Sequence, residues 1–181
     1  MSKEKLNILD DDGHIIGEEL RSVIHKKGLL HREIHVWLFT PDKRILFQHR
    51  AKNKDTAPDM LDATCGGHVD IGEDWLEAAV RELQEECGLS VRGDKLKFMR
   101  EFRNGGAYDP VTGTINNALR YVYAVEYTGK IDDLVPEEGK SQGFVAWELE
   151  DLKQLSEEES LKFIPSLIDE ASLSMYSLFW D

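Results

Sequence analysis

The sequence predicts an α/β domain in which a mixed central sheet lies between helices. Short apolar runs containing β-branched and aromatic residues recur along the chain, segments of helical periodicity separate them, and no internal repeat is present. The 181 residues are enough to bury one substantial core. We therefore expect a single globular unit without a second domain.

The first 28 residues indicate a hairpin and a short helix that pack on the main domain, residues 29–181. Apolar runs at residues 6–9 and 14–16 flank a turn whose Asp-Gly dipeptide is typical of β-hairpins. A short helix is predicted over residues 18–25 and is expected to stop at Gly28. This segment is thus an addition to the central fold.

Apolar runs with strand character supply the predicted sheet. The first two are joined by a turn at Pro41-Asp42, and a polar loop over residues 51–60 follows them. The predicted strands cover residues 34–39, 45–50, 63–65, 96–102, 118–127 and 144–147.

The remaining segments are expected to form a loop and two C-terminal helices. The Gly- and Asn-rich residues 103–117 form a loop long enough to help shape a pocket. Helices are predicted from about 148 to 155 and over roughly 159–179. The apolar run at 175–180 either packs on the domain or forms a homodimer contact.

Residues 74–87 predict the most informative helix, because they contain neither Gly nor Pro and are rich in good helix formers. On a helical wheel, Glu82, Glu85 and Glu86 share one face, which is predicted to lie roughly opposite the apolar stripe. That stripe consists of Leu76, Ala79, Val80, Leu83 and Cys87.

The three carboxylates predict a divalent-cation site. Like charges at these spacings repel by a few tenths of a kcal/mol per pair, so a helix optimised only for stability would not gather them. Carboxylate oxygens suit hard ions such as Mg²⁺ or Mn²⁺, and Mg²⁺ typically completes its shell with phosphate oxygens. Cysteine-based zinc binding has no support, since Cys65 and Cys87 form no CxxC pair. Without its surroundings, such a triplet is most often a solvated helix face.

The spacing around these acids resembles the Nudix box, Gx5Ex7REUxEExGU, where U is aliphatic. Every specified position from Gly67 to Leu89 is matched. The resemblance implies a Nudix-type α/β/α sandwich with a mixed central sheet. It also implies a hydrolase that uses Mg²⁺ or Mn²⁺ to cleave a diphosphate linked to another moiety, which it leaves unnamed.

The resemblance also implies roles for individual residues. Glu82, Glu85 and Glu86 match the family's metal ligands, together with the backbone carbonyl of Gly66, and Glu82 or Glu85 is the candidate base. Arg81 lies beside them on the wheel and is expected to orient a carboxylate. For Glu73, which precedes the helix, capping is a serious rival to a catalytic role.

Within that superfamily the N-terminal half is similar to isopentenyl diphosphate isomerases. Arg50 and Lys54 match residues that hold the substrate diphosphate in that group, and His68 is a further candidate substrate-binding residue. Histidines of the isomerases bind a metal, and His25, His31 and His68 lie in similar places. Isomerisation is therefore the alternative to hydrolysis.

Two departures favour hydrolysis over isomerisation. The isomerase cysteine directly precedes the Gly-His pair, where this chain has Gly66, and Cys65 stands one residue earlier, which turns its side chain to the other face of a strand. The isomerases also draw carboxylates from the strand after the box helix, but residues 115–120 contain no acid. A non-catalytic domain that binds a nucleotide or a partner is a third possibility. Such a domain would be expected to have a degenerate box, and the box of this chain is complete.

Charge and termini limit the expected partners and compartment. The net charge of −13 argues against binding duplex nucleic acid, whose affinity depends on neutralising phosphates. The polar start of the sequence lacks an apolar signal region, and no apolar run is long enough to span a membrane. We expect a cytoplasmic protein that acts on a small diphosphate-containing substrate.

Overall fold

A computed structural model describes residues 4–54, 56–106 and 108–181. Within these residues, nine strands form one sheet and two short strands form a separate hairpin. The strands are β1 (Lys5–Leu9), β2 (Ile15–Leu20), β3 (His31–Phe39), β4 (Arg44–Arg50), β5 (Leu61–Asp62), β6 (Cys65–His68), β7 (Lys97–Arg103), β8 (Tyr108–Asp109), β9 (Thr114–Ile115), β10 (Ala118–Glu126) and β11 (Ser141–Glu148). The α-helices are α1 (Arg21–Lys27), α2 (Trp75–Cys87), α3 (Leu149–Leu152), α4 (Glu157–Ser160) and α5 (Glu170–Ser177), and 3₁₀ turns occur at Gly93–Lys95, Ile131–Asp133 and Pro165–Leu167.

Strand β3 is the centre of the sheet, which is mixed as predicted. It runs parallel to β10 along its whole length and antiparallel to β1, β4 and β6. The hairpin of β1 and β2 joins the same sheet through the pairing of Ile8 with His31. The expected hairpin and mixed sheet are therefore confirmed.

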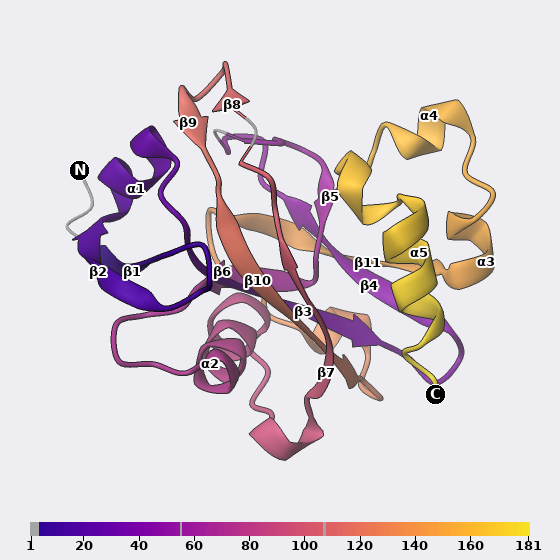
Figure 1. Ribbon diagram of the computed structural model, residues 1–181. Helices are drawn as coiled ribbons and strands as arrows, with labels where there is room; N and C mark the ends of the chain where they lie inside the picture. The colour runs from indigo at the N-terminus through magenta and orange to yellow at the C-terminus, as the bar shows by residue number, and fades with distance from the viewer. Residues whose placement is uncertain (1–3, 55, 107) are drawn as a thin grey trace.

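Helices cover both faces of this sheet (Figure 1). Because side chains alternate along β3, Val36 and Leu38 enter a core with α2, whereas Trp37 and Phe39 enter a core with α3 and α5. Tyr176 of α5 is fully buried beside Trp37, with ring centroids 4.9 Å apart. The predicted sandwich architecture is confirmed.

The C-terminal run at 175–180 packs on the domain. Phe179 lies against Phe39 with ring centroids 5.3 Å apart, and Trp180 Nε1 donates a hydrogen bond to the Thr40 carbonyl at 2.8 Å. Of the two expectations for this run, packing is confirmed.

Three helix predictions need correction. Glu18 and Glu19 belong to β2, where they pair with β1, so α1 begins only at Arg21. The helix predicted over 148–155 is restricted to the four residues of α3. The helix predicted over 159–179 is interrupted because Pro165 has no N–H to continue a helix and favours extended backbone at Ile164, whose ψ is 123°.

The loop predicted at 103–117 contains the small β8–β9 hairpin, which packs on α1. A Cβ placed on Gly28, at the end of α1, would lie 2.8 Å from Ile115 Cγ2. Gly28 also has a φ of 65°, a conformation that favours glycine at a helix end. This hairpin therefore packs against α1 and the residue that ends it.

Candidate functional site

The box helix α2 is fixed at both ends. Asp74 Oδ1 accepts hydrogen bonds of 2.8 Å from the amides of Leu76 and Glu77, and Glu77 Oε2 accepts one of 2.9 Å from the Asp74 amide. Gly88 ends the helix in the left-handed conformation, with φ 65°. This reciprocal cap satisfies amides that would otherwise lack partners, and it sets where the carboxylates of α2 lie.

Glu82 lies against the glycine turn that precedes the helix. A Cβ added to Gly67 would stand 2.0 Å from Glu82 Oε1, so only glycine fits while the carboxylate is in this position. Glu82 is 8% exposed, and burial raises its pKa even though Arg81 partly opposes the shift. Gly67 is thus required for close contact between strand β6 and this carboxylate.

Glu86 reaches the same strand one residue earlier. Its Oε2 accepts a hydrogen bond from the Gly66 amide at 3.2 Å and another from Gln48 Nε2 at 3.3 Å. Burial, followed by the negative charge of Glu82, raises the pKa of Glu86 to about 7. Burial and the repulsion between the two carboxylates therefore outweigh the nearby charges of Arg81 and Lys140, which is an electrostatic setting that favours a bound cation.

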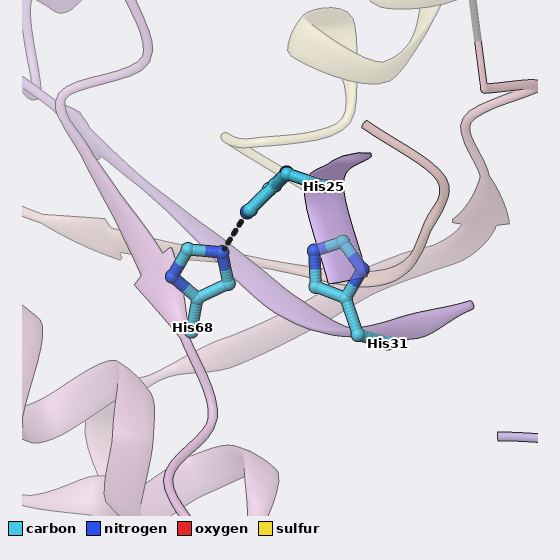
Figure 2. Close-up of side chains that lie close together, drawn as sticks. All are labelled: His25, His31 and His68. Atoms are coloured by element: carbon cyan, nitrogen blue, oxygen red, sulfur yellow. Dashed lines mark hydrogen bonds between the residues drawn. The ribbon is translucent and has the colours of Figure 1, made fainter. Parts of the chain in front are cut away.

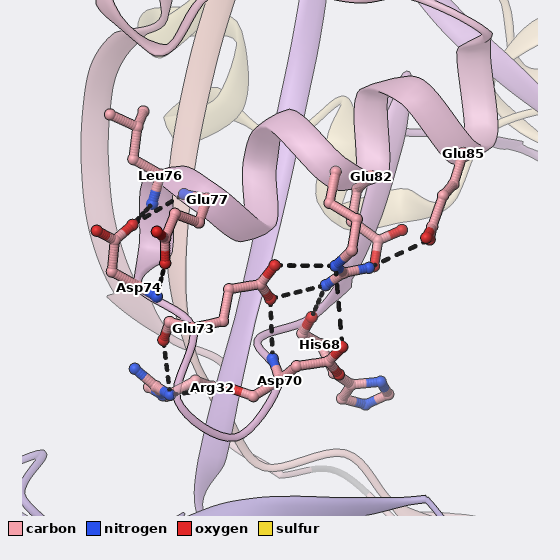
Figure 3. Close-up of polar contacts among 10 residues, drawn as sticks. Arg32, His68, Asp70, Glu73, Asp74, Leu76, Glu77, Glu82 and Glu85 are labelled. Atoms are coloured by element: carbon pink, nitrogen blue, oxygen red, sulfur yellow. Dashed lines mark hydrogen bonds and ion pairs between the residues drawn. The ribbon is translucent and has the colours of Figure 1, made fainter.

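Arg81 bonds to three acids around this turn. Figure 3 shows these acids, Glu73, Glu82 and Glu85, with their side chains turned toward one another. Its Nε and Nη2 each bond to Glu73 at 2.9 Å, while Nη1 contacts Glu82 Oε1 at 2.7 Å and Glu85 Oε2 at 3.2 Å. Nη2 also donates to the His68 carbonyl at 2.9 Å. Asp74 is the helix cap, and Glu73 instead holds the guanidinium that orients Glu82.

The predicted placement of these acids relative to the core was wrong in one respect. Glu82 and Glu86 face inward, whereas Leu76 is 36% exposed and packs beside Gly93. Ala79, Leu83 and Cys87 of the predicted stripe are buried as expected, but Ala78 and Glu82 are buried with them in place of Leu76 and Val80, so the helix is rotated relative to the predicted stripe. Glu85 remains solvent-accessible, with its side chain 55% exposed.

Comparison with known proteins identifies the family. The NUDIX domain profile matches residues 29–168, which is most of the chain. The chain belongs to the Nudix hydrolase family.

This Nudix protein is similar to both hydrolases and an isomerase of that superfamily. It is 30% identical over 159 residues to an uncharacterised Nudix hydrolase of Clostridium acetobutylicum, covering 84% of this chain and 73% of the relative. It is 33% identical over 156 residues to the isopentenyl-diphosphate Delta-isomerase of Serratia proteamaculans, covering 86% and 80%. A crystal structure from Deinococcus radiodurans superposes with a TM-score of 0.65 at 20% identity, covering 83% of this chain and 87% of that one, and supports the fold.

The Nudix protein uses Arg50 to hold a loop. Its Nη1 contacts Asp62 Oδ2 at 2.8 Å, and its other nitrogens donate to the carbonyls of Thr56 and Ala57. These bonds occupy the guanidinium that was predicted to bind substrate. They also fix the loop that carries Lys54.

Two lysines lie on the side of the site that faces Glu86. Burial and the nearby Arg50 lower the pKa of Lys54, while Glu86 acts in the opposite direction. Lys140 is half-exposed and bonds to Glu137 at 2.7 Å, and its charge also interacts with Glu86 and Glu82. The Ala51 amide donates to the Lys140 carbonyl at 3.0 Å, which joins the loops that carry the two lysines.

Sequence reasoning missed both Gln48 and Lys140. The only sequence signal for Gln48 is a polar residue within the apolar run of residues 45–48. Lys140 follows a Pro-Glu-Glu-Gly loop that resembles ordinary surface sequence, and its proximity to the box depends on the long-range contact with Ala51.

Histidines 25, 31 and 68 gather at the other side of β6 (Figure 2). Their ring centroids are 4.9–5.3 Å apart, and one nitrogen from each lies within 4.8 Å of the other two. His68 was expected to bind substrate, but its Nε2 lies 3.2 Å from His25 Nε2. The structure therefore brings His68 into a histidine cluster.

Cysteine chemistry is disfavoured in this Nudix protein. Cys65 is buried in the core beneath α2, and burial, followed by contact with Cys87, raises the pKa of its thiol. At Gly66, where the isomerases have their cysteine, an added Cβ would lie 2.6 Å from His35 Cδ2. The ring of His35 thus occupies the space that a side chain at position 66 would need.

The helices of the structure can also be examined for length and apolar character. Among the residues that the structure describes, no helix combines the length and apolar character needed to cross a bilayer.

Proposed function

We propose that this protein is a Mg²⁺- or Mn²⁺-dependent hydrolase that cleaves a diphosphate linkage in a small phosphorylated substrate, such as a nucleoside diphosphate linked to another moiety. The observation that carries the proposal is the approach of Glu82 and Glu86 to the Gly66-Gly67 turn, beside Arg81. The raised pKa of both carboxylates supports it, because a divalent cation would stabilise the two negative charges that burial and mutual repulsion disfavour.

The metal would be held by Glu82, Glu85, Glu86 and the Gly66 carbonyl. Oxygen donors of this kind fit Mg²⁺ or Mn²⁺. When bound, such an ion lowers the pKa of coordinated water and offsets charge on the phosphoryl oxygens. Arg81 is the positioning residue, since its bonds to Glu73 and Glu82 hold one carboxylate in a single orientation.

The remaining residues bind the diphosphate and accept a proton. Lys54 and Lys140 neutralise phosphate oxygens at the side of the site near Glu86, and Arg50 keeps the Lys54 loop in place. Glu82 or Glu85 takes a proton from water as the water oxygen bonds to phosphorus. The bond from that phosphorus to the bridging oxygen breaks, and the bridging oxygen leaves with the other product.

Phosphate-product release is the test of this function. Wild-type protein should hydrolyse at least one compound from a panel of nucleoside diphosphates, triphosphates, dinucleotides and nucleotide sugars, but only with Mg²⁺ or Mn²⁺ present. Glu85→Gln and Glu86→Gln should each reduce kcat by at least about 10²-fold with unchanged circular dichroism.

A matched control is Glu150→Gln, an exposed glutamate on the distant helix α3. It should retain wild-type turnover. Near wild-type rates in either box variant would remove that glutamate from the metal site, and inactivity across the whole panel would contradict the proposed activity.

Allylic isomerisation is the second candidate, favoured by the histidine cluster and by the similarity to the Serratia enzyme. The burial of Cys65, the lack of space at Gly66 and the absence of acids in residues 115–120 oppose it. Conversion of isopentenyl to dimethylallyl diphosphate without phosphate release would establish this alternative.

A further inference from the structure

We propose that Arg32 is a positioning residue of the box, which holds the loop between β6 and α2 so that the Glu73 carboxylate reaches Arg81. The inference rests on the proposed function, because Arg81 in turn orients a proposed metal ligand, Glu82. Arg32 itself lies on β3, outside the box sequence. Its side chain bonds to the loop, so its effect on turnover passes through that loop.

Arg32 binds this loop near both of its ends. Residues 69–74 connect β6 to α2. At the start of the loop, the Val69 amide donates a hydrogen bond to the Arg32 carbonyl at 3.2 Å. Toward its end, Arg32 Nη2 donates to the Glu73 carbonyl at 3.2 Å and to the Asp70 carbonyl at 3.4 Å. Figure 3 shows the guanidinium directed at the Glu73 backbone.

Two stacked aromatic rings support the guanidinium. Its carbon Cζ lies 5.3 Å from the ring centroid of Trp75, the first residue of α2. The Trp75 ring stacks on Tyr121 of β10, with centroids 3.9 Å apart and an interplanar angle of 6°. Because Arg32 contacts both the loop and the first residue of the helix, it fixes where α2 begins relative to the sheet.

The surroundings of Arg32 are unfavourable for a cation that only stabilises the fold. Burial lowers the pKa of its guanidinium, although the charges of Glu73 and Asp74 oppose the change. Within the described part of the chain, its Nε is buried without a hydrogen-bond partner. A partly buried charge that bonds to neutral carbonyls contributes little net stability. We therefore attribute its presence to the loop geometry that it maintains.

The shape of the loop determines where the Glu73 carboxylate lies. Glu73 Oε2 accepts a hydrogen bond from the Asp70 amide at 3.0 Å, and the Glu73 amide donates to the Asp70 carbonyl at 3.2 Å. The same carboxylate bonds to Arg81 Nε and Nη2 at 2.9 Å each. Arg81 Nη1 then contacts Glu82 Oε1 at 2.7 Å. Without the Arg32 side chain, the loop loses this link to β3, and Glu73 no longer presents both oxygens to Arg81.

Turnover of Arg32→Ala tests the role in the reaction, with whichever compound of the panel the wild-type protein cleaves. At saturating Mn²⁺ its kcat should fall by at least about tenfold, while KM stays within about twofold of wild type because the proposed phosphate-binding lysines are unchanged. Arg92→Ala is the control, since the Arg92 side chain is 81% exposed, and it should retain wild-type turnover.

A double-mutant cycle separates positioning through Glu73 from a general effect on the fold. Glu73→Ala removes the carboxylate that the loop presents, so adding Arg32→Ala to it should lower kcat by less than about twofold further. If Arg32 only stabilised the fold, the two losses would multiply. Arg32→Lys takes the place of Arg32→Ala in the cycle if that variant does not fold. It should lose about threefold in kcat, because an ammonium group is a point charge rather than a planar fork.

Hydrogen exchange at Arg81 tests the same link without turnover. In metal-free protein, the Arg81 Nε–H should give a ¹⁵N–¹H signal, identified by its absence in Arg81→Lys, because its bond to Glu73 protects it from water. In Arg32→Ala this proton should exchange at least about tenfold faster, and in Arg92→Ala at the wild-type rate. If the wild-type protein cleaves nothing in the panel, the proposed function fails, but this measurement still decides whether Arg32 positions Arg81.

Three results would overturn the proposal. Wild-type kcat in folded Arg32→Ala would show that turnover does not depend on this residue. Losses that multiply in the Arg32→Ala/Glu73→Ala protein would show a general effect on the fold instead of positioning. Unchanged exchange of the Arg81 Nε proton in Arg32→Ala would exclude the path through the loop.

Discussion

At the scale of single residues, Gly67 determines where the Glu82 carboxylate lies. The backbone of β6 and the side chain of α2 meet so closely there that no Cβ fits between them. Arg81 also restrains this carboxylate through the contact of its Nη1 with Glu82 Oε1 at 2.7 Å. The position of Glu82 therefore depends on a residue with no side chain and on one with a rigid planar side chain.

Gly67→Ala should reduce kcat by about 10²-fold while leaving the thermal unfolding midpoint close to wild type. The added methyl group must displace Glu82, and misplacement of a catalytic group by about 1 Å has effects of this size. Gly105→Ala is the control, since a Cβ there meets no atom within 4 Å. Equal kcat values in the two variants would show that the close contact has no catalytic importance.

Much of the site's identity was predictable at this scale, because helical spacing relates Arg81, Glu82, Glu85 and Glu86 without any tertiary information. Gln48 and Lys140 were not predictable in this way. Gln48 contacts Glu86 from β4, and the charge of Lys140, in the loop before β11, interacts with Glu86. Both relations depend on strand pairing rather than on local sequence.

At the scale of elements, α2 shows both what periodicity predicts and where it fails. Its start, length and glycine stop follow from local residues and agree with the structure. Its rotation against the sheet does not, because the buried face includes Ala78 and Glu82, whereas Leu76 of the predicted stripe is partly exposed. Periodicity also fails in the C-terminal segment. The residues after 159 favour a helix, but Pro165 interrupts it.

Asp74→Ala should lower the free energy of unfolding by about 1 kcal/mol, because the variant loses the cap of α2. Urea denaturation monitored by circular dichroism measures this change. Asp151→Ala, at an exposed position of α3, should change stability much less. A loss no greater than that of the control would show that the reciprocal hydrogen bonds at Asp74 contribute little.

At the scale of the whole molecule, β6 separates two sets of metal-ligand candidates with different chemistry. Carboxylates from α2 approach Gly66 and Gly67 on one face, and histidines from α1, β3 and β6 itself gather on the other. The net charge of −13 makes the basic residues near Glu86 important, since they provide local positive charge for a phosphorylated ligand. We expect this net charge to disfavour long polyanions more than a small anionic substrate.

The most direct test of the hydrolase site is anomalous diffraction from crystals soaked with Mn²⁺ and a non-hydrolysable diphosphate analogue. The account predicts a manganese peak in contact with the Glu82 and Glu86 carboxylates and the Gly66 carbonyl, with the diphosphate bound to the same ion. A well-ordered diphosphate with no manganese touching either carboxylate would contradict it.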